Sequence, residues 1–289
     1  MSDTHTYEGD EPIRLNKWMA SLGLCSRREA ESLIEKGEVS VNGEQVSSPG
    51  HKISPGETMT LGRAGAKQLD EQLTAVLHKP VGYVSSQPEA GQTPAVRLVT
   101  KSNLVGKAPK VPGRSTQLAP LGRLDMDSRG LLLLSEDGVL AKAVIGPLSG
   151  LEKEYLVTVK GQVTPQAVSQ LRNGLSLDGR RLKPAKVDQL GAGRLRFRLR
   201  EGRNRQIRRM CELVGLVVVD LHRVRIGPLE LGDLPEGKWR ALTSEERASL
   251  VSSAKAAASG GASGARSASA RSRGKGRPKG ARAGPPRKR

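Results

Sequence analysis

A carboxylate in a short glycine-bounded loop is the most informative feature of the sequence. Asp125 lies between Gly122 and Gly130, and Arg123 stands two residues before it. The run 131–134 that follows is entirely leucine, which is typical of a buried strand. Such a loop presents a reactive group at the surface while the strand behind it fixes its position. A turn that only caps a strand has the same short pattern, so further motifs must decide. Asp127 is interpreted as a loop-shaping residue or cap.

A tyrosine later in the chain is a second candidate site residue. Tyr155 begins an alternating segment, 155–160, that predicts a strand. A strand tyrosine is more often part of a core than a ligand contact. The chain holds only three Tyr, two Trp and one Phe, however, and the polar residues 152–154 before Tyr155 suggest the rim of a site. We therefore favour a functional role for Tyr155.

The segment 204–215 predicts a helix that presents arginines. Its apolar residues fall on the i, i+3, i+4, i+7 stripe of a buried face, and Gly215 ends it. Arg205, Arg208 and Arg209 are left outside that stripe. Cys211 lies on the stripe, and we interpret it as a core residue.

Composition points to a polyanionic partner. The 289 residues carry a net charge of +19, and nucleic acid is the commonest polyanion that such a protein binds. Eleven of the Lys and Arg residues, and no acidic residue, lie in 252–289. A hydrophobic content of 36% is sufficient for packed cores.

Cysteine and histidine usage argues against a metal site. Two cysteines and four scattered histidines give neither a disulfide framework nor metal-ligand spacing. We expect no metal and no cofactor. The polar N-terminus and the lack of a long apolar stretch predict a cytoplasmic protein without a membrane segment.

The first sixty residues predict a small domain of helices followed by a hairpin. We expect residues 1–12 to be disordered and 14–24 to be helical. Ser26 and Glu29 have the spacing of a capping box for a second helix, and Asn42-Gly43 is a strong hairpin signal. The string RLNKWMASLGLCSRREAESLIEKGEVSVNGEQV resembles the S4 RNA-binding domain, which we place at 13–63. Basic residues near the starts of both helices, where phosphate is favoured, are Arg14, Lys17, Arg27 and Arg28.

A larger domain follows. We interpret 64–75 as a linker and 76–250 as one α+β domain, because many short β-rich runs alternate with fewer helices. Residues 251–289 are predicted to be a disordered basic tail, since they offer almost no apolar side chains to bury.

The motifs of the larger domain resemble, in order, those of pseudouridine synthases of the RsuA/RluB/RluF branch, most of all the RluF type, which acts on large-subunit rRNA. They are Lys-Pro-x-Gly at 79–82, Gly-Arg-Leu-Asp at 122–125, Lys-x-Tyr at 153–155 and Asn-x-Gln-Ile-Arg-Arg-Met at 204–210. The resemblance implies a mixed, largely antiparallel sheet with flanking helices. It also implies that Asp125 is catalytic, that Tyr155 stacks on the target base, and that Arg208 pairs with Asp125.

The resemblance further implies the isomerisation of a uridine in RNA, with 23S rRNA or its precursor in the assembling large subunit as the expected partner, tRNA as a possible one, and a monomeric enzyme. Candidate phosphate contacts in the larger domain are Lys79, Arg123, Arg203, Arg205, Arg209, Arg223 and Arg225.

Two rival functions stay open. A non-catalytic S4-type assembly factor would show the same charge, but it has no use for a salt-paired carboxylate in an RNA groove. An RNA glycosidase would release free uracil instead of rejoining it.

Overall fold

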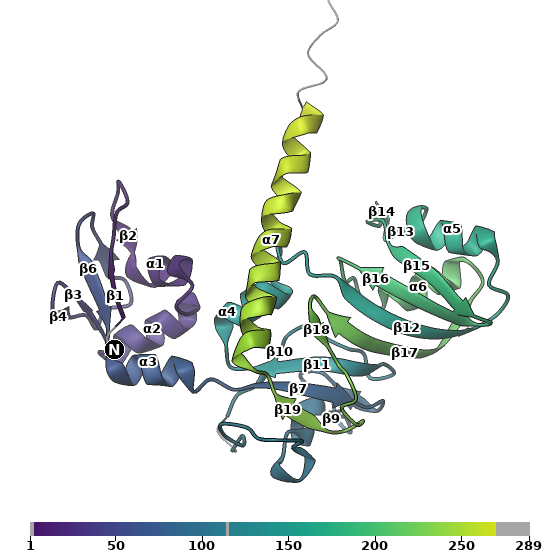
Figure 1. Ribbon diagram of the computed structural model, residues 1–289, viewed down its shortest axis with the longest axis horizontal. Helices are drawn as coiled ribbons and strands as arrows, with labels where there is room; N and C mark the ends of the chain where they lie inside the picture. The colour runs from purple at the N-terminus through teal and green to yellow at the C-terminus, as the bar shows by residue number, and fades with distance from the viewer. Residues whose placement is uncertain (1–2, 114–115, 270–289) are drawn as a thin grey trace, which may run out of the picture.

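A small N-terminal body is joined to a larger one built on a curved sheet (Figure 1). The computed structural model describes residues 3–113 and 116–269. In the small body, two helices cover a sheet of order β1-β6-β3-β4, and Leu15, Met19, Leu33 and Met59 are among its fully buried core residues. Its elements are β1 (Asp3–Thr6), β2 (Ile13–Arg14), α1 (Leu15–Leu22), α2 (Arg27–Glu35), β3 (Val39–Val41), β4 (Glu44–Gln45), β5 (Lys52–Ile53), β6 (Thr58–Leu61) and α3 (Arg63–Asp70).

Two local signals of the small body are confirmed. Ser26 caps α2 and Glu29 completes the capping box. Asn42 (φ 51°) and Gly43 (φ 85°) form the turn between β3 and β4. Glu29 also joins the two bodies, because its carboxylate accepts a hydrogen bond from the Gly138 amide at 3.1 Å and another from Gln72.

The expectation that residues 1–12 are disordered is wrong for β1, which pairs along its whole length with β6. Tyr7 then packs edge-on against Trp18. An edge strand is held by main-chain hydrogen bonds, so its polar side chains do not reveal it. The expected linker 64–75 is also largely wrong, because α3 occupies Arg63–Asp70 and its Ala66 and Leu69 pack on the small core.

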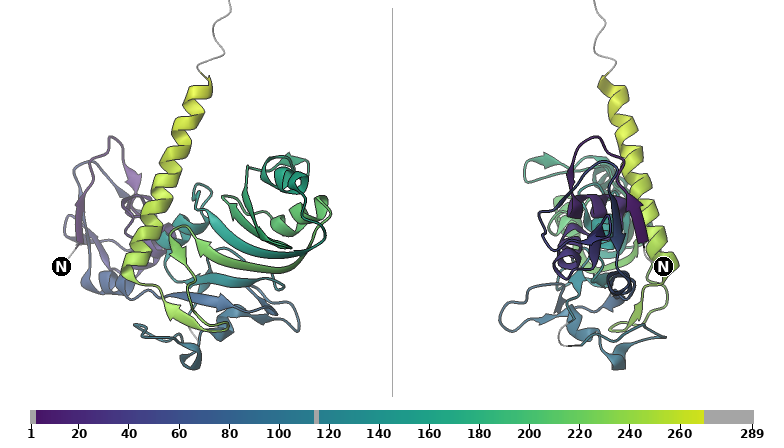
Figure 2. Two further views of the ribbon diagram at one scale, coloured as in Figure 1. Left: turned by 45° about the vertical axis from the view of Figure 1, so that its right-hand side comes forward. Right: turned by 90° about the vertical axis from the view of Figure 1, so that its left-hand side faces the viewer.

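The expected disordered tail from residue 251 is wrong as far as residue 269. The helix α7 (Ser244–Ser269) continues through this region, and Leu250 and Ala254 are buried against α4 (Gly138–Ile145). Alanine is the best helix former, and spacing of four residues gives α7 a short apolar stripe. Both views of Figure 2 show α7 projecting from the body. The rest of the expected tail, 270–289, lies outside the described residues.

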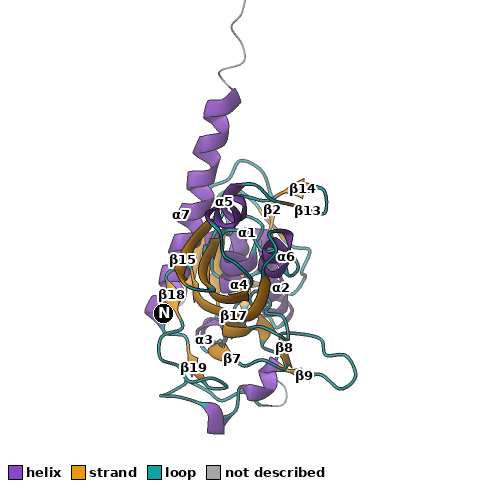
Figure 3. Cartoon of the chain, turned by 90° about the vertical axis from the view of Figure 1, so that its right-hand side faces the viewer, coloured by secondary structure: helices purple, strands orange, loops and turns teal. Residues whose placement is uncertain are grey.

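The larger body is an α+β domain with a mixed, mostly antiparallel sheet, as expected. The strand order is β15-β16-β12-β17-β11-β7-β19, and only the β11–β17 pair of this series is parallel. Figure 3 shows the strands as one curved layer with the helices around it. Its strands are β7 (Thr74–Lys79), β10 (Ala119–Pro120), β11 (Arg129–Ser135), β12 (Lys153–Lys160), β15 (Lys186–Gly191), β16 (Arg194–Leu199), β17 (Val217–Ile226), β18 (Leu229–Glu230) and β19 (Trp239–Ala241).

Helices and short elements cover this sheet. Two core clusters lie on opposite faces of β7 and β11, and a third lies between β12, β15 and β16 and the helices α5 and α6. No helix of the described residues is long and apolar enough to cross a membrane. The remaining elements are β8 (Tyr83–Val84), β9 (Thr93–Pro94), the 3₁₀ helices at Ala95–Leu98 and Lys101–Asn103, α5 (Pro165–Asn173), β13 (Ser176–Leu177), β14 (Arg180–Arg181) and α6 (Gln206–Leu213).

The junction of β11 and β17 places the Asp125 loop. The two strands pair only at Arg129–His222 and Gly130–Arg223. Gly130 has a φ of 112°, and a Cβ there would lie 2.2 Å from the carbonyl oxygen of Arg223. Only glycine fits so close an approach. The loop before β11 is thereby brought within reach of the Arg223 side chain.

Candidate active site

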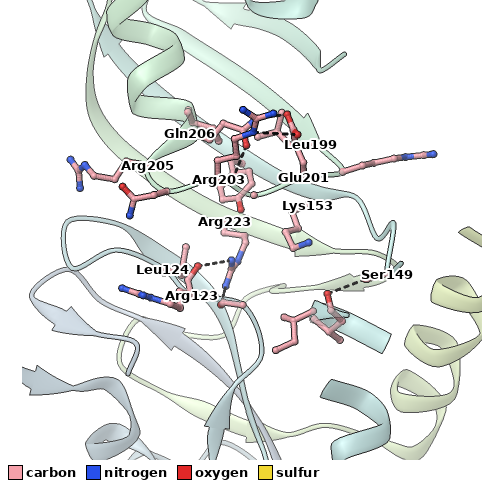
Figure 4. Close-up of a pocket in the computed structure, with 18 of the residues that line it drawn as sticks. Arg123, Leu124, Ser149, Lys153, Leu199, Glu201, Arg203, Arg205, Gln206 and Arg223 are labelled. Carbon is pink, nitrogen blue, oxygen red and sulfur yellow. Dashed lines mark hydrogen bonds and ion pairs between the residues drawn. The ribbon is translucent and has the colours of Figure 1, made fainter. Parts of the chain in front are cut away.

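A cleft of about 550 Å³ opens beside the Asp125 loop. Its walls come from that loop, from the start of β12, from the end of α4 and the turn after it, and from the segment between β16 and α6 (Figure 4). Asp125 and Tyr155 both line it, although they are thirty residues apart in the chain. The structure therefore brings the two principal candidates into one cavity.

Every main-chain carbonyl oxygen from Gly122 to Ser128 accepts a hydrogen bond. We call this set of contacts the carbonyl clamp. The donors are Arg223 to Gly122 (3.0 Å) and Arg123 (3.3 Å), the Ser85 hydroxyl to Leu124 (2.6 Å), the Ser128 amide to Asp125 (3.1 Å), the Gly82 amide to Met126 (2.8 Å), Arg208 to Asp127 (2.7 Å) and Lys79 to Ser128 (2.7 Å). Fixing the backbone in this way pre-positions the Asp125 side chain for chemistry.

The two aspartates of the loop have different surroundings. The Asp127 carboxylate accepts hydrogen bonds from Arg205 at 2.9 and 3.2 Å and lies 3.3 Å from Nε of Arg208. Although burial acts to raise the pKa of Asp127, the contacts with Arg205 and Arg208 lower it overall. The Asp125 carboxylate makes one described ionic contact, 3.8 Å from Arg205. Asp125 is thus the carboxylate left open to a substrate, and the contacts of Asp127 fit the loop-shaping role expected for it.

The expected pairing of Arg208 with Asp125 is wrong. Arg208 is 7% exposed and binds main-chain oxygens of Asp127 and Val218, so it ties the loop to β17. Arg205 faces Asp125 instead. Arg205 precedes α6 in the left-handed conformation (φ 49°), which sends its side chain toward the loop. The apolar stripe of α6 predicted that Arg208 is exposed. Arg208 is buried instead, because the protein also packs against the side of α6 that carries it.

Tyr155 is part of the wall of the cleft. It is half-buried, pairs across the sheet with Phe197 on β16 and Arg223 on β17, and packs against two core clusters. Core packing fixes its ring, while its place in the cleft leaves part of it accessible. These are the properties that a platform for a flipped-out base requires.

Comparisons with known proteins agree with this geometry. Residues 73–213 match the RNA pseudouridylate synthase family, and residues 13–58 match the S4 domain. The chain is 34% identical to the dual-specificity RNA pseudouridine synthase RluF of Escherichia coli (strain K12), over 86% of this chain and 82% of that protein. This chain belongs to the RsuA/RluF-type RNA pseudouridine synthases.

Two further relatives lie in the same family. The ribosomal large subunit pseudouridine synthase B of Bacillus subtilis (strain 168) is 34% identical, over 81% of this chain and 93% of its own length. A crystal structure of a pseudouridylate synthase is 30% identical, with a TM-score of 0.57, over 82% of this chain and 99% of that one.

Two of the basic residues expected to contact phosphate are buried inside this synthase. Lys79 is 0% exposed and Arg223 is 1% exposed, so the expectation is wrong for both. Both donate to carbonyl oxygens of the loop. Burial lowers the pKa of Lys79 to about 8, against the opposing effect of Asp125 and Asp127.

The other expected phosphate contacts divide into two groups. Arg203 donates to carbonyl oxygens of residues 177, 180 and 181, and Arg209 and Arg225 form ion pairs with nearby carboxylates. Together with Arg205, these side chains already have internal partners. The side chains that are exposed and without a described ionic partner are Arg14, Lys17, Arg27, Arg28 and Arg123.

Sequence reasoning missed Lys183, Arg200 and Glu201, which all line the cleft. Lys153 also lines it, within the segment 152–154 that was expected at the rim of a site, but it was given no role of its own. Its position two residues before Tyr155 on a strand could have indicated one, because the two side chains share a face. The described residues contain no group of three His, Cys, Asp or Glu side chains arranged to hold a metal ion.

Proposed function

We propose that this synthase converts a uridine of 23S rRNA, or of its precursor, into pseudouridine. The observation that carries the proposal is the open Asp125 carboxylate, on a clamped loop, in the same cleft as Tyr155. The large-subunit substrate is supported by the name of the B. subtilis relative. The dual specificity named for RluF makes tRNA a second substrate to test.

Asp125 acts at the ribose of the target nucleotide. The bond between N1 of uracil and C1′ breaks, the base rotates in the cleft, and C5 bonds to C1′ while C5 loses a proton and N1 gains one. Asp125 either attacks C1′ as a nucleophile, forming an ester bond that breaks when C5 bonds to C1′, or removes a proton from C2′ that is returned when C5 bonds to C1′. Both routes need a carboxylate that is free of competing hydrogen bonds, and Asp125 has that property while Asp127 does not.

Tyr155 holds the detached base and returns part of the stacking energy lost on flipping, roughly 1–3 kcal/mol. Arg205 orients Asp125, and Arg208 fixes the loop beneath it. In this assignment Arg208 is a positioning residue and Asp125 and Tyr155 touch the substrate.

The test is chemical mapping of pseudouridine in rRNA from cells with and without the protein, and in rRNA treated with the purified enzyme. Wild type should modify one uridine, and Asp125→Asn should modify none while it still binds RNA, because phosphate contacts persist. Full activity of Asp125→Asn would refute the assignment. RNA binding without modification by wild type would favour the assembly factor, and free uracil would favour the glycosidase.

A second pair of variants tests Tyr155. Tyr155→Ala should lose far more turnover than RNA affinity, because one base platform is a small part of the interface. Retained activity of Tyr155→Phe would assign stacking alone, whereas loss would assign the hydroxyl to proton removal at C5. Wild-type rates for Tyr155→Ala would return this residue to a purely structural role.

A further inference from the structure

Lys153 shares the face of β12 that carries Tyr155 into the cleft. The two residues pair in regular register with Leu199 and Phe197 of β16. The register shift against β17 between Glu154 and Tyr155 comes from an extra residue of β17, Val224, so β12 itself keeps its alternation. Residues i and i+2 of a strand point to the same side, about 7 Å apart. That separation is comparable with the distance between the base and a phosphate of one nucleotide. Figure 4 shows the Lys153 side chain among the residues that line the cleft. A base on Tyr155 would therefore place one of its flanking phosphates near Lys153.

The ammonium group of Lys153 lacks a strong partner among the described residues. Its hydrogen bond is a long one, 3.4 Å to the carbonyl oxygen of Leu151. Burial, together with the nearby Arg223 guanidinium, lowers the pKa of Lys153 to about 8. Burial of the Lys153 charge and its repulsion by Arg223 are both unfavourable in the free protein. A bound anion would offset both the burial and the repulsion.

The two buried or half-buried arginines of the cleft, Arg223 and Arg203, are occupied in a way that Lys153 is not. Arg223 gives its donors to the carbonyl oxygens of Gly122, Arg123 and Leu131. Arg203 is bound to the β13–β14 turn. Lys153 is thus a cation at the cleft wall whose binding capacity is left unused by the protein.

We infer that Lys153 binds a phosphate that flanks the target uridine, so that β12 holds one nucleotide at two points, the base on Tyr155 and the backbone on Lys153. The inference rests on the proposed function, because it takes the base on Tyr155 as its starting point. It adds a phosphate subsite that fixes how deeply the nucleotide enters the cleft.

Binding to an rRNA fragment that contains the target uridine gives the first test. Full-length Asp125→Asn protein is compared with the same protein carrying Lys153→Met. Loss of one phosphate contact should weaken binding about tenfold and reduce the slope of log affinity against log salt by about 0.7, the value for one contact with a single strand. Lys153→Arg should restore both, because the charge returns.

Lys160→Met is the matched control. Lys160 ends the same strand, is exposed, and lies outside the cleft. Its replacement should change neither affinity nor slope. If Lys160→Met and Lys153→Met weaken binding equally, general charge explains the effect and the phosphate subsite is refuted.

Neutral linkages identify the phosphate. Two RNAs carry a single methylphosphonate, one on the 5′ side and one on the 3′ side of the target uridine. The tenfold difference between the proteins with and without Lys153→Met should vanish with one of these RNAs and persist with the other. Persistence with both would overturn the inference. Lys153→Gln replaces Lys153→Met if the methionine variant has a lowered melting temperature.

Failure of this inference differs from failure of the proposed function. The binding assays use protein that does not turn over, so they report on the phosphate alone. Absence of pseudouridine with wild-type enzyme would refute the function, whereas an active wild type with unchanged Lys153→Met binding would refute only the subsite.

Discussion

The Asp125 loop and the starts of α1 and α2 use the same residue types in opposite ways. Around the loop, Lys79, Arg208 and Arg223 are buried and donate to main-chain oxygens. On the S4 domain, Arg14, Lys17, Arg27 and Arg28 are exposed and have no described ionic partner. The basic residues of this enzyme therefore divide between those that build the site and those that stay exposed to solvent.

Burial decides which of the two roles a basic side chain takes. A cation withdrawn from water is tolerated only when its donors are satisfied, and carbonyl oxygens of a loop can do this without neutralising it. An exposed cation keeps its hydration until a phosphate displaces it. Substitutions in the two regions should consequently have different signatures.

The largest effect is expected for Arg223→Met. It leaves the carbonyl oxygens of Gly122, Arg123 and Leu131 without their donor in the interior. We expect a loss of about 3 kcal/mol in the free energy of unfolding and at least ~100-fold in kcat/KM. Urea unfolding measures the loss of stability, and single-turnover rates measure the loss of activity. Arg123→Met, an exposed neighbour, is the control and should retain wild-type stability. Equal stability of the two variants would remove the distinction between the regions.

A smaller effect is expected for Ser85→Ala. The buried Ser85 hydroxyl donates to the Leu124 carbonyl and accepts from the Leu124 amide at 2.8 Å. Its removal should cost about 1–2 kcal/mol of folding free energy and about tenfold in turnover, with RNA affinity unchanged. Ser86→Ala tests whether any serine in this turn has the same importance. Unchanged turnover of Ser85→Ala would show that the clamp does not need its contact at Leu124.

Sequence reasoning located the loop but not the contacts that hold it. The Asp125 motif and the leucine strand are local patterns, and the structure confirms the buried strand and the loop before it. Apart from the Ser128 amide within the loop, the donors come from Lys79, Gly82, Ser85, Arg208 and Arg223, which approach only after β7, β11 and β17 are assembled. No local pattern distinguishes a buried arginine from an exposed one at such positions.

Local backbone conformation explains other differences. Arg205, and not Arg208, lies beside Asp125 because Arg205 has a left-handed backbone conformation at the start of α6. Residues other than glycine rarely adopt this conformation, so the sequence did not predict it. The strand β1 and the helix α7 were missed because composition reports whether a segment can form a core of its own. It does not report whether a segment can pair with an existing edge or core.

The S4 side of the comparison is tested by a double substitution. Arg27→Gln with Arg28→Gln should leave the melting temperature unchanged, weaken RNA binding about tenfold, and reduce the salt slope by about 1.4 to 1.8. Arg63→Gln with Lys67→Gln on α3 removes the same charge elsewhere in the chain. A reduction of equal size in that control would mean that net charge, and not placement at the helix starts, determines affinity.

The smallest expected effect is a pH dependence of stability that comes from His222 on β17, the strand that pairs with β11 after the Asp125 loop. His222 stacks on His78 with ring centroids 5.2 Å apart. Burial, with Arg129 and His78, lowers the pKa of His222 to about 4 despite Asp220. Between pH 6.5 and 4 the unfolded chain takes up a proton that the folded protein refuses, so stability is lost as the pH falls through this range.

Replacing the histidine should remove that dependence. From about pH 6.5 to 4.5, wild type should lose about 1–2 kcal/mol more unfolding free energy than His222→Gln, allowing for the partial exposure of the ring. Urea unfolding at the two pH values measures the difference. His51→Gln, at a position on the S4 domain, should behave as wild type. Parallel pH profiles for wild type and His222→Gln would exclude this site as the source.

The carbonyl clamp has a consequence for how such an enzyme can be diversified. Its donors bind main-chain oxygens, which every amino acid possesses, so the exposed side chains of the loop are not part of the clamp. Met126 is 47% exposed and Arg123 faces the cleft. Libraries at these two positions can sample new RNA preferences without loosening the aspartate. The backbone of the loop, which positions Asp125, must therefore stay constant, whereas the side chains at positions 123 and 126 are free to vary.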